Sequence, residues 1–234
     1  MNFNINDCIK LWIEIFGDGE EYIQRFYDNF GGDVFTHYDG DKLACMVNRV
    51  PINYGNHNGG YIYAACTHPE YRGKGIFRRL LIEAEADMDF MMLIPAEPEL
   101  YAMYRKLGYD RIAYSKYPAE VEIDGFAKPF NGDFKELYRI YLENLGENEF
   151  IKPYNIFVLS VYYFAKHGMI HLDNDNGFMI YETNGKNIIK IYDIYCKNFT
   201  LCDTINEHEN GVYKILDKSL VLPEKMKVNL FMEV

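Results

Sequence analysis

The segment from Tyr71 to Arg79 concentrates residue types that bind anions. It carries four cationic side chains and two glycines in an otherwise acidic chain. An apolar, strand-like run precedes it at 61–66, and an amphipathic helical pattern follows it. The first N–H groups of a helix lack internal partners and lie at the positive end of its dipole, and glycines let the main chain approach a phosphate closely. The strand, the glycine turn and the helix start together predict a cradle for a diphosphate.

Two other phosphate-binding motifs do not fit this segment. A P-loop requires Ser or Thr after its lysine, whereas Gly75 follows Lys74. A dinucleotide fingerprint requires three spaced glycines and a later acidic residue for the ribose, and the segment lacks that pattern. Taken alone, the segment also fits a surface turn followed by a solvated basic helix start.

The composition limits the partners of this segment. The chain has 234 residues, of which 49% are hydrophobic and 25% charged, so it can bury a substantial core. Its net charge is −11, and without the four cations of 71–79 it has 20 basic against 35 acidic residues. A nucleic-acid partner is not expected, because such a protein needs a broad basic face. A basic island in a negative protein suits a small polyanion, and the surrounding field favours a cationic second substrate such as an amine.

Cysteine usage and hydropathy indicate a cytoplasmic protein. The five cysteines are odd in number and form no C-x-x-C pair, which favours reduced thiols and argues against a disulfide framework or a zinc site. Asp7 and Glu14 interrupt the apolar pattern of the N-terminus, unlike a secretion signal. No uncharged apolar run approaches membrane-spanning length, so no membrane partner is expected.

The first half of the chain predicts the order helix, helix, three strands, helix, strand, helix, strand. We expect these elements at 7–16, 20–30, 34–38, 43–50, 61–66, 76–88, 91–94, 98–107 and 111–117, with a glycine-rich loop at 53–60. This order predicts an α/β fold, with a mixed sheet flanked by helices.

The second half repeats the opening order. We expect helices at 133–145 and 156–167, strands at 169–172, 178–182 and 188–195, a polar loop at 203–211, and strands at 212–216 and 228–234. The repeat is consistent with a degenerate internal duplication and equally with coincidence, since residue identity between the halves is low. We divide the chain into domains 1–123 and 124–234. The apolar run 154–164 predicts packing between the two halves or a homodimer interface.

The segment from Cys66 to Leu81 resembles the acetyl-CoA loop of the GNAT family of N-acyltransferases. The family pattern is Gln/Arg-x-x-Gly-x-Gly/Ala, often after a His-Pro pair. Here it runs from Arg72 to Phe77, and Phe77 departs from the small residue expected at the last position. A second likeness lies downstream, where 94–96 and 100–109 resemble the family's strand and its Phe-Tyr-x-Lys-x-Gly-Phe helix. The two motifs cover roughly 60–115 of the chain, and beyond about residue 120 the likeness is one of element order only.

The resemblance implies a GNAT-type fold that binds acetyl-CoA where the parallel strands 61–66 and 90–94 splay. Main-chain N–H groups near Cys66 and Thr67 would hold the thioester carbonyl. Amides and cationic side chains of the loop, with Arg79 as a further candidate, would hold the phosphates. The implied cofactor-binding residues are Cys66, Thr67, Arg72, Gly73, Lys74, Gly75, Ile76, Phe77 and Arg78.

The resemblance also implies a general acid. Tyr104 stands where the family places a tyrosine near the leaving sulfur, and Tyr101, one turn earlier, is the alternative. The residues leave several candidates for the general base. The strand before the loop shows Tyr61 and Tyr63 where many relatives carry a carboxylate. The remaining options are Glu97 or Glu99, the histidines His37, His57 and His68, a water relay, and an amine that arrives neutral.

Other reactive residues have simpler explanations. Cys66 lies on an apolar strand without a histidine partner in the sequence, which favours a small buried side chain over a nucleophile. His167 and His171 straddle Gly168 at a predicted helix end, so no metal site is expected. The function that the resemblance implies is N-acetyl transfer from acetyl-CoA to a primary amine. The alternative is a non-catalytic protein that binds acetyl-CoA as a sensor or supports a partner.

Overall fold

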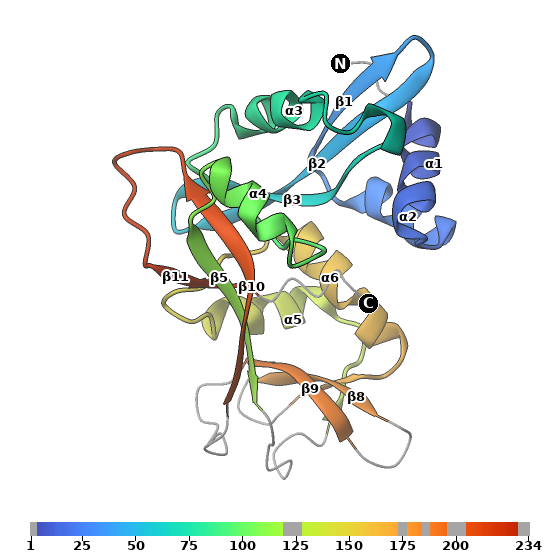
Figure 1. The fold of residues 1–234 in the computed structure, drawn as a ribbon. Helices are drawn as coiled ribbons and strands as arrows, with labels where there is room; N and C mark the ends of the chain where they lie inside the picture. The colour runs from blue at the N-terminus through green and yellow to red at the C-terminus, as the bar shows by residue number, and fades with distance from the viewer. Residues whose placement is uncertain (1–3, 119–127, 173–176, 184–187, 196–204, 229–234) are drawn as a thin grey trace. The chain divides into compact units, whose positions relative to one another are not determined.

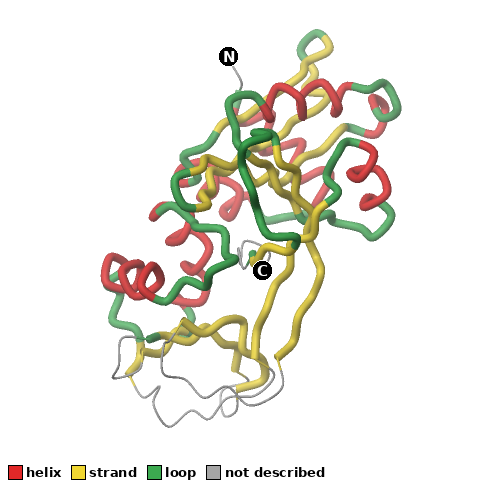
Figure 2. The backbone as a smooth tube through the Cα atoms, turned by 90° about the vertical axis from the view of Figure 1, so that its left-hand side faces the viewer, coloured by secondary structure: helices red, strands yellow, loops and turns green. Residues whose placement is uncertain are grey.

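The computed structural model describes residues 4–118, 128–172, 177–183, 188–195 and 205–228 (Figure 1). The contacts group the chain into two compact units, 1–112 with 211–224 and 113–210 with 225–234. Strands β5 (Arg111–Pro118) and β10 (Ile205–Ile215) are neighbours in one sheet, and each passes from one unit into the other (Figure 2). The predicted domain boundary at 123/124 lies outside the described residues.

The first unit confirms the predicted order of helices and strands. Its sheet has the order β1-β2-β3-β4-β10, in which β3 and β4 are parallel and the other neighbours antiparallel. Its helices and remaining strands are α1 (Ile5–Phe16), α2 (Glu20–Asn29), β1 (Asp33–Asp39), β2 (Lys42–Tyr54), β3 (His57–Thr67), α3 (Ile76–Glu85), β4 (Phe90–Leu93) and α4 (Leu100–Lys106).

Neighbouring residues of a strand face opposite sides of the sheet, and here the two sides carry different helices (Figure 1). Ile62 of β3 lies in a core cluster with the apolar side of α3 and with Tyr104 of α4. Tyr63, the next residue, packs against Trp12 of α1 and Phe26 of α2. The strand pair β3–β4 is therefore covered by α3 and α4 on one face and by α1 and α2 on the other.

The prediction of a loop at 53–60 is wrong. Strands β2 and β3 form one long hairpin that turns at Gly55, and Gly59 and Gly60 lie inside β3. A Cβ at Gly59 would lie 2.2 Å from the ring of Phe90, and one at Gly60 would lie 2.6 Å from the sulfur of Met91. The two glycines allow β3 to pack closely against its neighbours and do not form a loop. Local sequence patterns do not distinguish a glycine of this kind from a loop glycine.

Two further boundaries differ from expectation. Helix α3 ends at Glu85 rather than near 88, because Ala86 is extended and Asp87 has a positive φ of 62°. The expected polar loop at 203–211 is part of β10 from Ile205 onward. Its polar residues fit a strand there because Glu207 and Glu209 are exposed and form ion pairs with Lys225.

The second unit confirms the predicted helix-helix-strand-strand-strand order. Strands β6 to β9 form an antiparallel sheet in sequence order. The apolar side of α6 packs in this unit's own core with α5 and the sheet, so packing between the two halves is not needed to explain its apolar run. The elements are β6 (Lys128–Pro129), α5 (Phe134–Glu143), α6 (Tyr154–Lys166), β7 (Ile170–Leu172), β8 (Phe178–Thr183), β9 (Ile188–Tyr195) and β11 (Lys225–Lys227), after which the expected strand at 228–234 lies almost entirely outside the described residues.

A group of four charged side chains, three of them buried, ties β11 to the rest of the second unit. The Lys227 Nζ atom lies 3.3 Å from Glu149 and 3.4 Å from Asp193, and Tyr195 donates a hydrogen bond to Glu149. Lys152, 2% exposed, lies over the ring of Tyr141. Burial lowers the pKa of Lys152 to about 8, although the two carboxylates oppose this shift. Two lysines and two acids balance one another, as buried charges must.

We expect the free energy of unfolding to rise with pH above about 8 because of Lys152. Below that pH, Lys152 is protonated in both states; between about 8 and 10.5, the unfolded chain binds the extra proton. Stability should then rise by at most ~1.4 kcal/mol per pH unit. Urea titrations from pH 7 to 9.5 measure the slope, and Lys152→Met should abolish it. An unchanged slope in Lys152→Met would contradict this assignment.

Candidate active site

The parallel pair β3–β4 opens partway along β3. Pairing runs from Gly59↔Phe90 to Ile62↔Leu93 and ends there, while β3 continues to Thr67. On the β4 side, the main chain of 64–67 therefore has no strand partner among the described residues. This is the splay that the resemblance implied, and it leaves N–H and C=O groups of β3 available to a ligand.

A β-bulge lies within this open part of β3. Met46 pairs with Cys66 and Asn48 with Tyr63, so Ala64 and Ala65 together oppose the single residue between the β2 partners. Ala64 has a φ of 45°, which is uncommon for a residue with a Cβ. A bulge bends a strand and redirects its main-chain groups, and such strain is concentrated at functional sites.

The glycine-basic segment forms a turn and an uncapped helix start. Gly73 and Gly75 have φ values of 75° and 74°, in the left-handed region that favours glycine. Helix α3 begins after Gly75 without a side-chain cap and without an acidic residue in its first turn. The N–H groups of 76–78 have no hydrogen-bond partner among the described residues. These N–H groups carry the positive end of the helix dipole, as an anion site requires.

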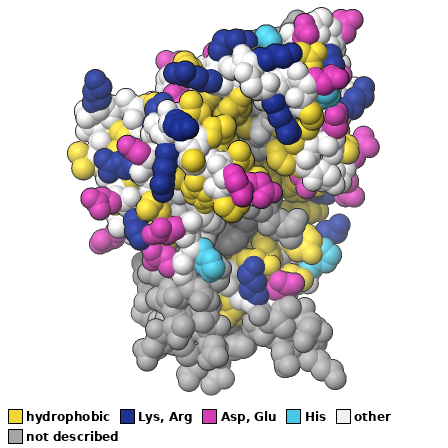
Figure 3. Space-filling view, in the orientation of Figure 1, with side chains coloured by type: hydrophobic (Ala, Val, Ile, Leu, Met, Phe, Trp, Pro, Cys, Tyr) yellow, Lys and Arg dark blue, Asp and Glu magenta, His cyan; other side chains and the backbone are white. Residues whose placement is uncertain are grey.

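The cations of the segment divide into two sets. Arg72 folds back so that its Nε donates to the Thr67 carbonyl at 3.1 Å, and Lys74 lies 4.7 Å from the ring of Tyr71. Arg78 and Arg79 are exposed and have no ion-pair partner in the described part of the chain. Lys and Arg side chains gather over α3 and the turn before it in the space-filling view (Figure 3). Arg72 thus helps to shape the turn, and Arg78 and Arg79 are available to a phosphate.

Tyr104 reaches this region from α4. Its side chain is 7% exposed and packs in the cluster that contains Ile76 and Leu93. Burial raises its pKa to about 12, so the phenol keeps its proton at neutral pH. Its hydroxyl has no hydrogen-bond partner among the described residues. The Phe77 ring stands edge-on to Tyr104 with centroids 6.1 Å apart, so this departure from the family pattern packs toward the core.

The base candidates differ in their surroundings. Glu97 and Glu99 are exposed before α4. His68 has both ring nitrogens engaged: Nδ1 accepts the Glu70 N–H at 3.3 Å, and Nε2 lies 3.2 Å from Glu14. His57 stands nine residues before Cys66 on β3, ~30 Å away along a strand. His57 is therefore excluded as a base at the splay, and the other candidates stay predictions.

Cys66 has the surroundings expected of a buried apolar side chain. It is 5% exposed, and burial raises the pKa of its thiol far above the usual range. A thiol of this kind does not form the thiolate that a nucleophile requires.

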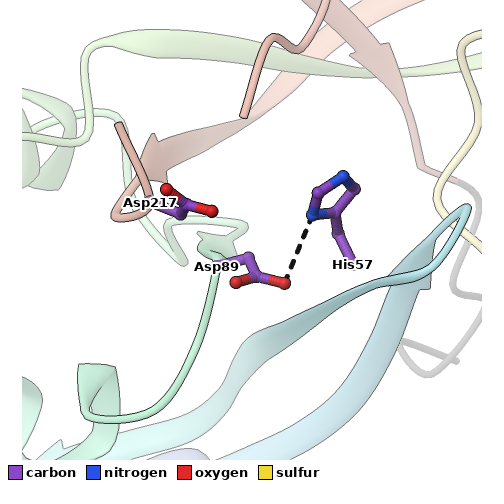
Figure 4. Close-up of side chains that lie close together, drawn as sticks. All are labelled: His57, Asp89 and Asp217. Atoms are coloured by element: carbon purple, nitrogen blue, oxygen red, sulfur yellow. Dashed lines mark ion pairs between the residues drawn. The ribbon is translucent and has the colours of Figure 1, made fainter. Parts of the chain in front are cut away.

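His57 belongs to a second polar cluster, at the opposite end of β3 (Figure 4). Its Nδ1 lies 3.4 Å from Asp89, and one ligand atom from each of His57, Asp89 and Asp217 lies within 4.8 Å of the others, so the three could offer donors to a cation. Nearby groups already occupy the carboxylates: Asp89 accepts the Asn58 N–H, and Asp217 accepts the N–H and hydroxyl of Ser219. The cluster accordingly joins the start of β3 to Asp89, whose carbonyl in turn accepts the N–H groups of Leu216 and Asp217 after β10. The expectation of no metal stays a prediction.

Sequence reasoning missed Asn48 and Tyr27. Asn48 is fully buried on β2 beneath the bulge, and Tyr27 of α2 donates a hydrogen bond to it. The available signal was one amide within the run 43–50, whose other residues are apolar except for Arg49. Its partner could not be found in the sequence, because the contact joins residues 21 apart through tertiary packing.

The splayed parallel strands, the bulge and the uncapped helix start define an α/β fold of the GNAT type. Residues 2–112 match the family model described as an acetyltransferase (GNAT) domain, and this part of the chain is a GNAT domain. A search of curated proteins found no match. Every helix in the described ranges is too short or too polar to cross a lipid bilayer.

Solved structures share this fold over most of the chain. A conserved protein of unknown function from Enterococcus faecalis V583, described as a probable N-acyltransferase, has a TM-score of 0.65 at 15% identity, over 90% of this chain and 69% of its own. A GCN5-related N-acetyltransferase from Kribbella flavida has a TM-score of 0.60 at 13% identity, over 93% and 71%. Eis1 from Mycobacterium abscessus has 0.58 at 10%, over 84% and 70%. At these identities the likeness shows the fold, which here extends into the second unit.

Proposed function

We propose that this protein transfers an acetyl group from acetyl-CoA to a primary amine by direct attack. The observation that carries this proposal is the open edge of β3, which leads directly into a glycine turn and a helix start with free N–H groups. A diphosphate at the helix start and a thioester at the open edge are the two parts of CoA that such an arrangement would hold.

The chemistry assigns a role to each part. The amine loses a proton to become a neutral nucleophile and a second one as the amide forms; Glu97, Glu99 or a water relay to solvent are the candidates that accept them. Its nitrogen attacks the thioester carbonyl carbon, and main-chain N–H groups of β3 between the bulge and Thr67 stabilise the oxyanion. The C–S bond then breaks, CoA leaves as a thiolate, and Tyr104 supplies a proton to the sulfur. Its raised pKa of about 12 keeps the phenol protonated throughout the working range, so a proton is present as negative charge develops on the sulfur. Cys66 takes no covalent part, and no residue is acylated.

The glycine turn before α3 and the first helical turn of α3 bind the phosphates. The amides from Gly73 to Arg78 face the diphosphate, and Arg78 and Arg79 supply positive charge that no neighbouring carboxylate neutralises among the described residues. Arg72 acts on the turn through its hydrogen bond to Thr67. The acidic remainder of the chain favours an amine that arrives as a cation.

Ligand binding and turnover test the proposal separately. Acetyl-CoA at 100 times its dissociation constant should stabilise the fold by about 2.7 kcal/mol, seen as a higher melting temperature. CoA release, followed with a thiol reagent over a panel of primary amines, reports transfer. Stabilisation without turnover on any amine would favour the alternative of a non-catalytic acetyl-CoA sensor, which the missing strand carboxylate keeps open. No stabilisation would contradict both.

A further inference from the structure

A buried side-chain bridge supports the bulge of β3. The Nδ2 atom of Asn48 donates to the carbonyl of Tyr63 at 3.1 Å, and its Oδ1 accepts the hydroxyl of Tyr27 at 3.2 Å. Asn48 has no exposed surface. The bridge thus joins α2 to the peptide group immediately before Ala64.

Each member of the bridge has a physical task. The extra residue of a bulge leaves main-chain groups without their ladder partners, and a buried carbonyl without a partner costs ~1–3 kcal/mol. The Asn48 amide satisfies the Tyr63 carbonyl. The Tyr27 hydroxyl donates to the amide oxygen, an arrangement that leaves the amide nitrogen facing the Tyr63 carbonyl. Burial raises the pKa of Tyr27, so the hydroxyl stays a donor.

The bridge also acts against a local strain. The positive φ of Ala64 costs ~1–2 kcal/mol in a residue with a Cβ, and such a conformation persists only where its surroundings enforce it. Fixing the Tyr63 carbonyl fixes the peptide plane on one side of Ala64. The direction of the following N–H groups on the open edge of β3 depends on that plane.

We propose that Asn48, oriented by Tyr27, is a positioning residue for acetyl transfer, and that it holds the bulge so that the open edge of β3 faces the thioester carbonyl. This inference rests on the proposed function. It adds a role for two residues that touch neither substrate.

The test compares acetyl-CoA with CoA, because only acetyl-CoA has the carbonyl that the open edge would bind. We expect Asn48→Ala to lower kcat by ~10–100-fold, less than the full loss of an oxyanion donor. The dissociation constant of CoA should change less than about threefold, while the preference for acetyl-CoA over CoA disappears. Tyr27→Phe, which removes one hydroxyl and keeps the packing, should show the same pattern with a smaller loss.

A second substitution separates positioning from general destabilisation. Glycine adopts a positive φ without strain, so Ala64→Gly should restore part of the activity when added to Asn48→Ala. Val50→Ala, a buried change on the same strand away from the bulge, is the control for lost stability alone and should keep the acetyl-CoA preference. If Asn48→Ala does not fold, Tyr27→Phe tests the positioning role by the same measurement, the ratio of the dissociation constants of CoA and acetyl-CoA.

The outcomes distinguish the two proposals. If the unsubstituted protein binds neither ligand, the proposed function fails and this inference fails with it. If it binds both, and Asn48→Ala and Tyr27→Phe leave both the acetyl-CoA preference and kcat unchanged, the positioning role alone is overturned. The ratio of the dissociation constants of CoA and acetyl-CoA tests the positioning role even where no amine in the panel is acetylated.

Discussion

Tyr104→Phe is expected to lower kcat by ~10²–10⁴-fold, the range for loss of a general acid. The hydroxyl is the only group lost, and the ring stays packed beside Phe77. The KM for acetyl-CoA should change little, because the hydroxyl matters only as negative charge develops on the leaving sulfur. Steady-state kinetics at saturating amine measure both constants.

Stability provides an internal check on this result. The Tyr104 hydroxyl has no hydrogen-bond partner among the described residues, so its removal should leave the melting temperature almost unchanged. Tyr101→Phe on the same helix is the matched control and should keep most of the activity. Full activity in Tyr104→Phe would remove it from the mechanism, and loss of activity in Tyr101→Phe instead would transfer the acid role to Tyr101.

Gly75→Asn is expected to weaken the binding of CoA and acetyl-CoA by at least ~10-fold. Asparagine tolerates the left-handed conformation, so the change tests space rather than backbone strain. Apart from Gly75 and its two chain neighbours, no atom of the described residues lies within 4 Å of a Cβ built at Gly75, and this open space adjoins the free N–H groups of α3. A side chain there would occupy the proposed position of the diphosphate. Isothermal titration calorimetry with CoA measures the effect.

Gly55→Asn is the matched control for this substitution. Gly55 also has a positive φ, of 55°, and also has no atom within 4 Å of a built Cβ, but it lies in the β2–β3 turn at the far end of β3. We expect both variants to melt within a few degrees of the unsubstituted protein and only Gly75→Asn to lose affinity. Equal affinities in the two variants would place the diphosphate away from the start of α3.

The features that could be predicted from the sequence depend on neighbours along the chain. The left-handed turn at Gly73 and Gly75, the helix start at Ile76 and the order of elements are set by residue type and by periodicity within short windows. Tyr104 was proposed because the segment 100–109 resembles the family's helix motif, which is also a match of neighbouring residues. These patterns predicted an α/β fold with an anion-binding glycine-basic segment, and the resemblance of 66–81 and 100–109 to family motifs predicted the GNAT fold.

Tertiary structure decided the features that depend on strand register. Pairing between β3 and β4 stops at Ile62 and Leu93, the bulge falls at Ala64, and Asn48 reaches the Tyr63 carbonyl from another strand. Each of these requires the alignment of segments that are distant in the chain, and a shift of one residue would turn every side chain of a strand to the other face. The glycines at 59 and 60 were misread for the same reason, since only the packed neighbours Phe90 and Met91 reveal why no side chain fits there.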